Sequence, residues 1–456
     1  MKKVFYSLIL FSFVLLSSTH VSAQNESTGK IRERGLEMLK EIKTLVEEKY
    51  YDPNFRGLDL EKKYKAAREE IKKAERNGHV YSIIAQFLLD FNDSHLFFLP
   101  PNRVMAVDYG ISMKMVGDNC YISVVDKGSD AEKQGVKVGD LLYSLETFEP
   151  TRESLWKLQY FYYRLSPQPV LRLVIQNPDQ TLRQVNVQAK VKSWKELDKE
   201  QREKLKKETE KEKEKYEQAK KDQFFKCREV NAELIACKLK SFVAPEKEID
   251  RMMSEIGNHK ALILDLRGNG GGLVATMKYL IGYFFEKDVK VGTEKMRKSE
   301  KEEIAKTHGS KVFKGNLTIL IDSKSASASE VFSRVMQLEK RGTIVGDRSA
   351  GAVMTSIRAN NAFVRGVDLL TITPYGLSLT IADLIMADGK SLEIVGVTPD
   401  VLVLPSGEDL FKRRDVVLAR AGEALGFSLT AENAGKLFTD EAITEIQSET
   451  ESEEDN

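Results

Sequence analysis

The chain up to about residue 90 repeats apolar residues at the spacing of a helix. Such a repeat places apolar side chains on one helix face, where they can pack against a core. The apolar positions are Leu36, Leu39, Ile42, Leu45 and Val46 in one stretch, and Ile83, Ile84, Phe87 and Leu88 in a second. The sequence therefore predicts an N-terminal helical cap at residues 24–105, closed by Pro100 and Pro101.

Between residues 106 and 191 the pattern changes to short strands and glycine turns. Residues 121–125 are mostly apolar and β-branched, which favours a strand. A short helix is expected at Ala131, and Gly135 and Gly139 mark two turns that lead into another strand. We therefore expect a small β domain at residues 106–191.

Residues 192–223 are rich in lysine and glutamate and contain neither glycine nor proline. Pairs of opposite charge four residues apart, such as Glu203 and Lys207, stabilise a solvent-exposed helix. The segment therefore predicts a charged helical linker, which acts as a spacer arm between two domains.

From residue 224 onward, apolar runs of strand length alternate with helical segments. The runs lie at residues 261–266, 317–321 and 343–346. A helix is expected from Ser329 to about Lys340. Buried strands that alternate with helices indicate a layered α/β core, which we place at residues 224–438. Residues 439–456 are acidic, so we expect a disordered tail there.

The charged side chains nearly cancel, with 70 Lys and Arg against 69 Asp and Glu. This balance gives no reason to expect a nucleic acid or an anionic membrane surface as partner. The N-terminus carries two lysines, an apolar run at residues 4–16 and the small-residue sequence Val21-Ser22-Ala23. This order is typical of a secretory signal peptide at residues 1–23, so we expect a periplasmic or secreted protein. The alternative is an uncleaved anchor, although the run is shorter than the about 20 residues of a membrane span.

Export makes disulfides chemically accessible. Residues 225–239 are expected to form a hairpin that turns near Ala232, and Cys227 and Cys237 are equidistant from this turn. A disulfide and two buried thiols are both compatible with this spacing. The third cysteine, Cys120, lies elsewhere. Since no paired Cys/His spacing is present, neither zinc nor another metal is expected.

One candidate for chemistry is the sequence Ser325-Ala326-Ser327-Ala328-Ser329-Glu330, between a buried strand and a helix. A nucleophilic serine at this position has backbone N–H groups and a helix N-terminus nearby, and both stabilise an oxyanion. Ser327 and Glu330 also match a capping box, which is a purely structural role. This motif alone does not establish catalysis.

A second candidate is Asp265-Leu266-Arg267-Gly268-Asn269-Gly270-Gly271-Gly272, which follows another apolar run. A dinucleotide-binding loop would need a glycine at position 273, but that residue is Leu273, and no phosphate-binding lysine follows. A glycine loop at a strand end can also direct bare N–H groups towards a substrate carbonyl.

Taken together, the two motifs resemble the carboxyl-terminal-processing peptidases and their tricorn-like relatives. The closing motif of that family is also present, as Gly396-Val397-Thr398-Pro399-Asp400. The resemblance implies a layered ClpP/crotonase-like α/β core with an inserted PDZ-like β domain, and it places the nucleophile at Ser327. It also implies protein or peptide substrates, no cofactor, and assembly into homo-oligomers, for which no interface is readable.

The stretch from Gly128 to Asp140 resembles a PDZ domain, and Tyr109-Gly110-Ile111-Ser112 occupies the position of its carboxylate-binding loop. Backbone N–H groups there would bind a terminal carboxylate while a peptide adds as a strand. The alternative is a small β domain with ordinary turns.

The chain departs from the lysine-type members of the family at one position. The segment that carries their general base contains Ala352 where the lysine would stand. Tricorn-like members instead use a Ser-His pair, found here as Ser94 and His95, and a glutamate before the closing motif, found here as Glu393. Alone, His95 would be interpreted as a core or capping histidine.

The resemblance therefore implies a serine endopeptidase in which His95 takes the Ser327 proton and returns it to the leaving amine. Ser94 and Glu393 would orient the imidazole. The oxyanion would bind the N–H of Ala328 and one from Gly270 or Gly271. The competing hypothesis is an inactive scaffold that has lost catalysis with its lysine and binds peptides or apolar ligands.

Overall fold

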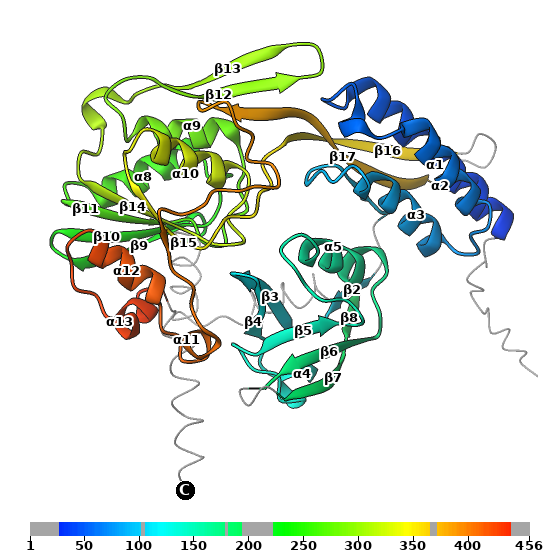
Figure 1. The fold of residues 1–456 in the computed structure, drawn as a ribbon, viewed down its shortest axis with the longest axis horizontal. Helices are drawn as coiled ribbons and strands as arrows, with labels where there is room; N and C mark the ends of the chain where they lie inside the picture. Colours follow the sequence, from blue (N-terminus) through cyan, green and yellow to red (C-terminus); the bar gives the residue numbers. More distant parts are fainter. Residues whose placement is uncertain (1–26, 102–104, 178–180, 194–221, 365–371, 439–456) are drawn as a thin grey trace, which may run out of the picture.

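The computed structural model describes residues 27–101, 105–177, 181–193, 222–364 and 372–438 (Figure 1). The expected signal peptide, nearly all of the charged linker and the acidic tail lie outside these residues.

A six-stranded sheet forms the centre of the C-terminal part, in the order β18-β15-β14-β11-β10-β9. All neighbours are parallel except the β9–β10 hairpin. The strands are β9 (Phe225–Asn231), β10 (Leu234–Leu239), β11 (Ala261–Asp265), β14 (Asn316–Ile321), β15 (Thr343–Gly346) and β18 (Val401–Leu402). The three apolar runs predicted as strands are β11, β14 and β15, so this prediction is confirmed.

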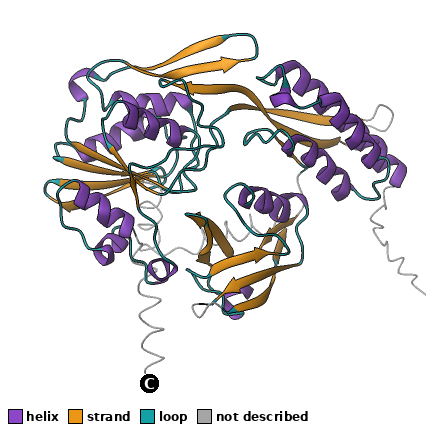
Figure 2. Ribbon diagram, in the orientation of Figure 1, coloured by secondary structure: helices purple, strands orange, loops and turns teal. Residues whose placement is uncertain are grey.

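Helices cover both faces of this sheet (Figure 2). The helices on one face are α8 (Glu246–Ile256), α9 (Val274–Gly282) and α10 (Ala328–Leu338), and those on the other are α12 (Val416–Ala424) and α13 (Ala431–Lys436). Strand β11 shows why its sequence is apolar throughout: Leu262 and Leu264 join the first hydrophobic core, while Ala261 and Ile263 join the second. A short helix, α11 (Gly407–Phe411), precedes α12.

A second sheet connects this core to the N-terminal helices (Figure 1). Its strands are β1 (Phe97–Leu99), β12 (Val289–Met296), β13 (Glu300–Ala305), β16 (Thr355–Val364) and β17 (Ile372–Met386). The long strand β17 pairs with β16 along most of its length, with β1 near its start and with β12 near its end. Strand β17 therefore links the two halves of the molecule.

The N-terminal helices pack on the first part of β17. They are α1 (Thr28–Lys49), η1 (Phe55–Gly57), α2 (Leu60–Ile71) and α3 (Asn77–Leu89). Leu39 and Ile42 of the predicted stripe are fully buried, and they share one hydrophobic core with Leu377 and Leu379 of β17. These helices thus complete a core that extends into the C-terminal half. Among the described helices, none has the length and apolar character needed to cross a membrane.

Residues 105–177 and 181–193 form a separate β unit. Its main sheet has the order β3-β4-β5-β6-β7, and β2 pairs with β8 beside it. The elements are β2 (Met105–Asp108), β3 (Ile111–Val116), β4 (Asn119–Val125), α4 (Asp130–Lys133), β5 (Leu141–Leu145), α5 (Leu155–Tyr160), the π-helical turn η2 (Phe161–Leu165), β6 (Val170–Gln176), β7 (Leu182–Gln188) and β8 (Lys190–Ser193). The predicted strand at residues 121–125 and the short helix at Ala131 are both present. The β unit has its own hydrophobic core.

The β9–β10 hairpin joins Cys227 and Cys237 in a disulfide. A β-bulge between Leu234 and Ile235 shifts the pairing by one residue, and Cys227 lies opposite Cys237 only after this shift. Without the bulge, Cys237 would lie opposite Arg228. The spacing allowed either a disulfide or two buried thiols, and the structure contains the disulfide.

Candidate active site

Ser327 stands at the junction between the loop after β14 and helix α10, at the carboxyl end of the central sheet. Its backbone has φ 55° and ψ −121°. A non-glycine residue in this region is strained by roughly 1–3 kcal/mol, and such strain is found mainly at functional sites. The residue is half-buried, whereas the next residue, Ala328, is buried. The chain thus presents one partly accessible hydroxyl at the start of a buried helix.

Glu330, one turn into α10, fixes the backbone around Ser327. Its fully buried carboxylate accepts a hydrogen bond from the N–H of Ser327 at 2.9 Å. It also accepts from the Ser349 hydroxyl at 2.6 Å, the Gly351 N–H at 2.7 Å and the Ala352 N–H at 2.9 Å. Burial raises the pKa of Glu330, and these four donors offset part of that effect. The glutamate interpreted as a capping residue therefore also anchors the loop at residues 349–352.

The glycine loop after β11 lies against Ser327. A Cβ at Gly271 would come within 2.6 Å of Ser327 Cβ, so only glycine allows this approach. The Gly271 N–H donates to Asn269 Oδ1 at 2.9 Å. The N–H groups of Gly270 and Ala328 make no hydrogen bond within the described residues. Between the two glycines considered for the oxyanion, Gly270 therefore has the free donor, and Gly271 has the contact with Ser327.

Ser94, His95 and Glu393 form a continuous hydrogen-bonded chain. The Ser94 hydroxyl lies 2.7 Å from His95 Nδ1 and donates to Glu393 Oε2 at 3.0 Å. The Ser94 backbone N–H donates to Glu393 Oε1 at 2.8 Å. Residues almost 300 positions apart in the sequence thus meet in one cluster.

One peptide group connects this cluster to Ser327. The carbonyl of Ala352 accepts from the Ser327 N–H at 2.8 Å. The N–H of Val353, on the opposite side of the same planar amide, donates to Glu393 Oε2 at 3.0 Å. Ser327 and Glu393 therefore flank a single peptide bond, at the position where the family resemblance led us to look for a lysine.

The electrostatics of the cluster favour a neutral imidazole. Burial lowers the pKa of His95, and the nearby Asp93 carboxylate counteracts this only in part. Burial also raises the pKa of Glu393 to about 7, against the hydrogen bonds from Ser94 and Val353. When Glu393 is ionised, the Ser94 O–H points to it, and the Ser94 oxygen is left to accept from Nδ1–H. This arrangement leaves the lone pair on Nε2, as a general base requires.

Asp93 is a site residue that the sequence did not single out. Its buried carboxylate accepts from the backbone N–H groups of His95 at 2.9 Å and Leu96 at 3.1 Å. It also accepts from the hydroxyls of Tyr50 and Thr380, both at 2.8 Å. Asp93 thus ties the turn that contains His95 to Tyr50, directly after α1, and to Thr380 of β17. The one available signal was the tendency of an aspartate to cap the turn that follows it.

The structure brings the four proposed catalytic residues into one region, but it does not join all of them directly. No hydrogen bond between the Ser327 hydroxyl and the His95 imidazole is present in the described part of the chain. Catalytic hydrogen bonds are often long before substrate binds. The direct contacts are those among Ser94, His95 and Glu393, and Ser327 is attached through the 352–353 peptide group.

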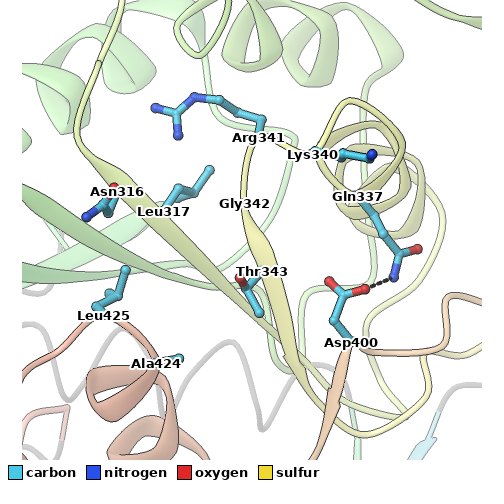
Figure 3. A pocket seen from close by; sticks show the side chains of 10 residues that line it. All are labelled: Asn316, Leu317, Gln337, Lys340, Arg341, Gly342, Thr343, Asp400, Ala424 and Leu425. Atoms are coloured by element: carbon cyan, nitrogen blue, oxygen red, sulfur yellow. Dashed lines mark hydrogen bonds between the residues drawn. The ribbon is translucent and has the colours of Figure 1, made fainter.

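A cavity of about 520 Å³ lies at the opposite end of α10 from Ser327 (Figure 3). Gln337, Arg341 and Thr343 line it, where β14 and β15 begin rather than end. It is therefore remote from the proposed nucleophile. Within the described ranges, no three His, Cys, Asp or Glu side chains are grouped as a metal site would need.

Comparison with known families identifies the domain that carries this site. The model of peptidase family S41 matches residues 236–403, which include the glycine loop, Ser327 and Glu393. The chain carries a peptidase family S41 domain. Ser94 and His95 lie outside the matched residues but contact the S41 domain through Glu393.

Curated relatives agree with this family. The chain is 30% identical over 193 residues to a tail-specific protease of Haemophilus influenzae, an alignment that covers 41% of this chain and 26% of the relative. It is 30% identical over 166 residues to a carboxy-terminal-processing protease of Bartonella bacilliformis, covering 36% and 35%. The match thus spans about a quarter to a third of these relatives. The family model and the names of these relatives thus associate residues 236–403 with peptidases.

Solved structures show a shared fold over more of the chain. Mature CPAF superposes with a TM-score of 0.62 at 15% identity, covering 84% of this chain and 94% of that one. CPAF in complex with lactacystin gives a TM-score of 0.61, also at 15% identity, covering 84% and 95%. At this identity the likeness concerns the mixed α/β fold alone.

The pKa of His95 can be tested directly. We expect its imidazole to titrate below the ordinary histidine value of about 6.5, because burial disfavours the charged form. Asp93→Asn should lower the pKa further, since it removes the nearby negative charge. NMR titration of the ring protons, in a Ser327→Ala background that prevents self-cleavage, measures both. An unchanged or raised pKa in the parent protein would contradict the described environment.

Proposed function

We propose that this protein is an exported serine endopeptidase that cleaves protein substrates through Ser327, with His95 as general base. The observation that carries the proposal is the chain from Glu393 through Ser94 to His95, joined to Ser327 by the 352–353 peptide group. A surface histidine would need none of these partners. Ala352 removes the lysine mechanism, and His95 supplies a base in its place.

In the proposed reaction, Nε2 of His95 removes the proton from Ser327 as its oxygen attacks the scissile carbonyl. The imidazolium then gives this proton to the leaving amine, and water repeats the sequence to release the acyl group. Ser94 receives the Nδ1–H hydrogen bond and relays the charge of Glu393, which stabilises the imidazolium. The carboxylates of Asp93 and Glu393 accept hydrogen bonds from backbone N–H groups, and these bonds keep the imidazole and the turn that carries it in place.

The oxyanion of the tetrahedral intermediate is proposed to bind the N–H of Ala328 and the N–H of Gly270. Ala328 is the first residue of α10, so its N–H has no partner within the helix. Gly271 would serve by allowing the glycine loop to approach Ser327 without a Cβ. Preorganised donors of this kind each contribute about a hundredfold or more to the rate.

The β unit is proposed to be PDZ-like and to recognise the substrate terminus or to gate access. Strand β3 lies at the edge of its sheet and, among the described strands, pairs with β4 alone, so a peptide could add alongside it. Gly110 has φ 66° and its N–H donates to Asp108, whereas Tyr109 and Ile111 are buried. Ser112 is the loop residue that remains partly accessible.

The wider organisation is part of the same proposal. Residues 224–438, which contain the S41 domain, would be a ClpP/crotonase-like core, residues 24–105 its helical cap, and the charged segment at 192–223 a spacer arm. Unfolded or C-terminally exposed chains are the proposed substrates, because a strand-adding β unit favours extended peptides. The N-terminal signal supports export, and homo-oligomers are proposed from the family resemblance alone.

Cleavage of an unfolded protein tests this function. We expect the full chain to degrade a carboxymethylated substrate, and Ser327→Ala and His95→Ala to lower the rate about a thousandfold or more. His79→Ala, at an exposed position of α3, is the matched control and should retain full activity. Mass spectrometry of the products measures each rate. No cleavage by a folded wild type would instead support a peptide-binding scaffold.

The role of the β unit has a separate test. Ser112→Glu places a negative charge in the loop and should repel a terminal carboxylate, whereas Ser112→Gln changes the size without the charge. We expect KM for a substrate with a free C-terminus to rise in the glutamate variant only. KM for an amidated substrate and hydrolysis of a short chromogenic peptide should stay unchanged. Equal losses on all three substrates would contradict a recognition role.

A further inference from the structure

An arginine that precedes α5 makes one of the contacts between the β unit and the S41 domain. The Arg152 guanidinium pairs with Asp347, and both side chains are nearly buried. Its Nε donates to the Gly117 carbonyl at 2.8 Å, and Nη1 donates to the Arg348 carbonyl at 3.0 Å. The planar guanidinium thus makes contacts on both sides of the interface.

Both carboxylate oxygens of Asp347 accept hydrogen bonds. Besides the Arg152 guanidinium, Oδ2 accepts from the Gly117 N–H at 2.9 Å. The other oxygen, Oδ1, accepts from the Arg348 N–H at 2.7 Å. The Asp347 N–H continues the central sheet by donating to Ile321 at the end of β14. Asp347 therefore links the β unit to the carboxyl end of β15 in the central sheet.

The segment that begins at Asp347 leads directly to the catalytic cluster. Ser349 bonds to Glu330, and its hydroxyl also accepts from the Val397 N–H at 2.6 Å. Gly351 and Ala352 bond to Glu330 as well, and the Ala352 carbonyl accepts from the Ser327 N–H. Only four residues, 348–351, therefore lie between Asp347 of the interdomain ion pair and Ala352, whose peptide group joins Ser327 to Glu393.

From this continuity we infer that Arg152 is a positioning residue for catalysis: through Asp347 it holds the segment at 347–352 in the geometry that places Ser327. The inference rests on the proposed function and deepens it. It gives the β unit a role in the active site that is independent of substrate recognition. A second contact, at Ser323, whose hydroxyl donates to the Met115 carbonyl at 2.6 Å, fastens the same edge of the β unit to the loop before Ser327. Figure 1 shows this β3–β4 end facing the central sheet.

The ion pair between Arg183 and Asp140 provides a matched control. It lies within the β unit, with an N–O distance of 2.8 Å and partly buried side chains. Removing it perturbs the same domain without touching the S41 domain. Arg183→Ala therefore reports what a loss of β-unit stability alone does to activity.

The test uses a short chromogenic peptide, which cannot engage both the β unit and the active site. We expect Arg152→Ala to lower kcat by about tenfold to a hundredfold with little change in KM, because a displaced catalytic segment slows chemistry rather than binding. Arg152→Lys should restore part of kcat, since it keeps the charge but not the planar fork. Arg183→Ala should leave kcat within about twofold. Wild-type kcat in Arg152→Ala, or an equal loss in Arg183→Ala, would overturn the inference.

Amide hydrogen exchange tests the positioning role of Arg152 without relying on the proposed peptidase activity. The N–H groups of Gly351 and Ala352 are bonded to buried Glu330, so they should exchange slowly in the wild type. Arg152→Ala should speed their exchange about tenfold or more, while Arg183→Ala should not. If the wild type cleaves nothing but this difference is found, the proposed function fails and the positioning role stands. Unchanged exchange in Arg152→Ala would overturn the positioning role whether or not the protein cleaves peptides.

Discussion

The geometry of the site depends on one buried carboxylate. Glu330 binds the N–H of the proposed nucleophile and three donors of the loop at 349–352, so it joins α10 to the segment after β15. Burying a carboxylate without hydrogen-bond partners costs far more free energy than one hydrogen bond contributes. All four donors are therefore needed together. The loop in turn provides the peptide group that separates Ser327 from Glu393. Removing Glu330 would therefore release both.

The hydrogen-bonded cluster of Ser94, His95 and Glu393 and the neighbouring Ser327 are assembled from distant parts of the chain. Ser94 and His95 follow the N-terminal helices, Glu393 follows the second sheet, and Ser327 follows strand β14 of the central sheet. Asp93 connects the first of these to β17, and the 352–353 peptide group connects the last two. The site is complete only when the N-terminal helices share their core with β17. The hydrogen-bonded cluster therefore depends on that core.

Much of this was predictable from the sequence, and the reasons differ by element. Strands β11, β14 and β15 are buried on both faces, so they appear as continuous apolar runs. The glycine loop and the serine motif were found because local backbone geometry dictates their composition. The contact between Ser94 and Glu393 could not be derived from spacing, since it depends on the pairing of β1 with β17 across about 280 residues. It was expected only through the family resemblance.

The structural features that the sequence did not predict were missed for specific reasons. Periodicity does not reveal that Leu39 packs on Leu377, nor that a single-residue bulge sets the register of the β9–β10 hairpin. Nothing in the local sequence distinguishes Arg152 from a surface residue, and the one signal for Asp93 was the tendency of an aspartate to cap the turn that follows it. The assignment of catalytic roles to Ser94, His95, Ser327 and Glu393, and the PDZ-like character of the β unit, remain predictions.

The central claim is that a relay ending at His95 activates Ser327 without a lysine. Intact-mass detection of fluorophosphonate labelling tests this most directly, because the reagent reacts with an activated serine and needs no knowledge of the substrate. The account predicts one label on the wild type, none on Ser327→Ala, and labelling slowed by orders of magnitude on His95→Ala. Labelling of His95→Ala at the wild-type rate, or a folded wild type that takes no label, would contradict it.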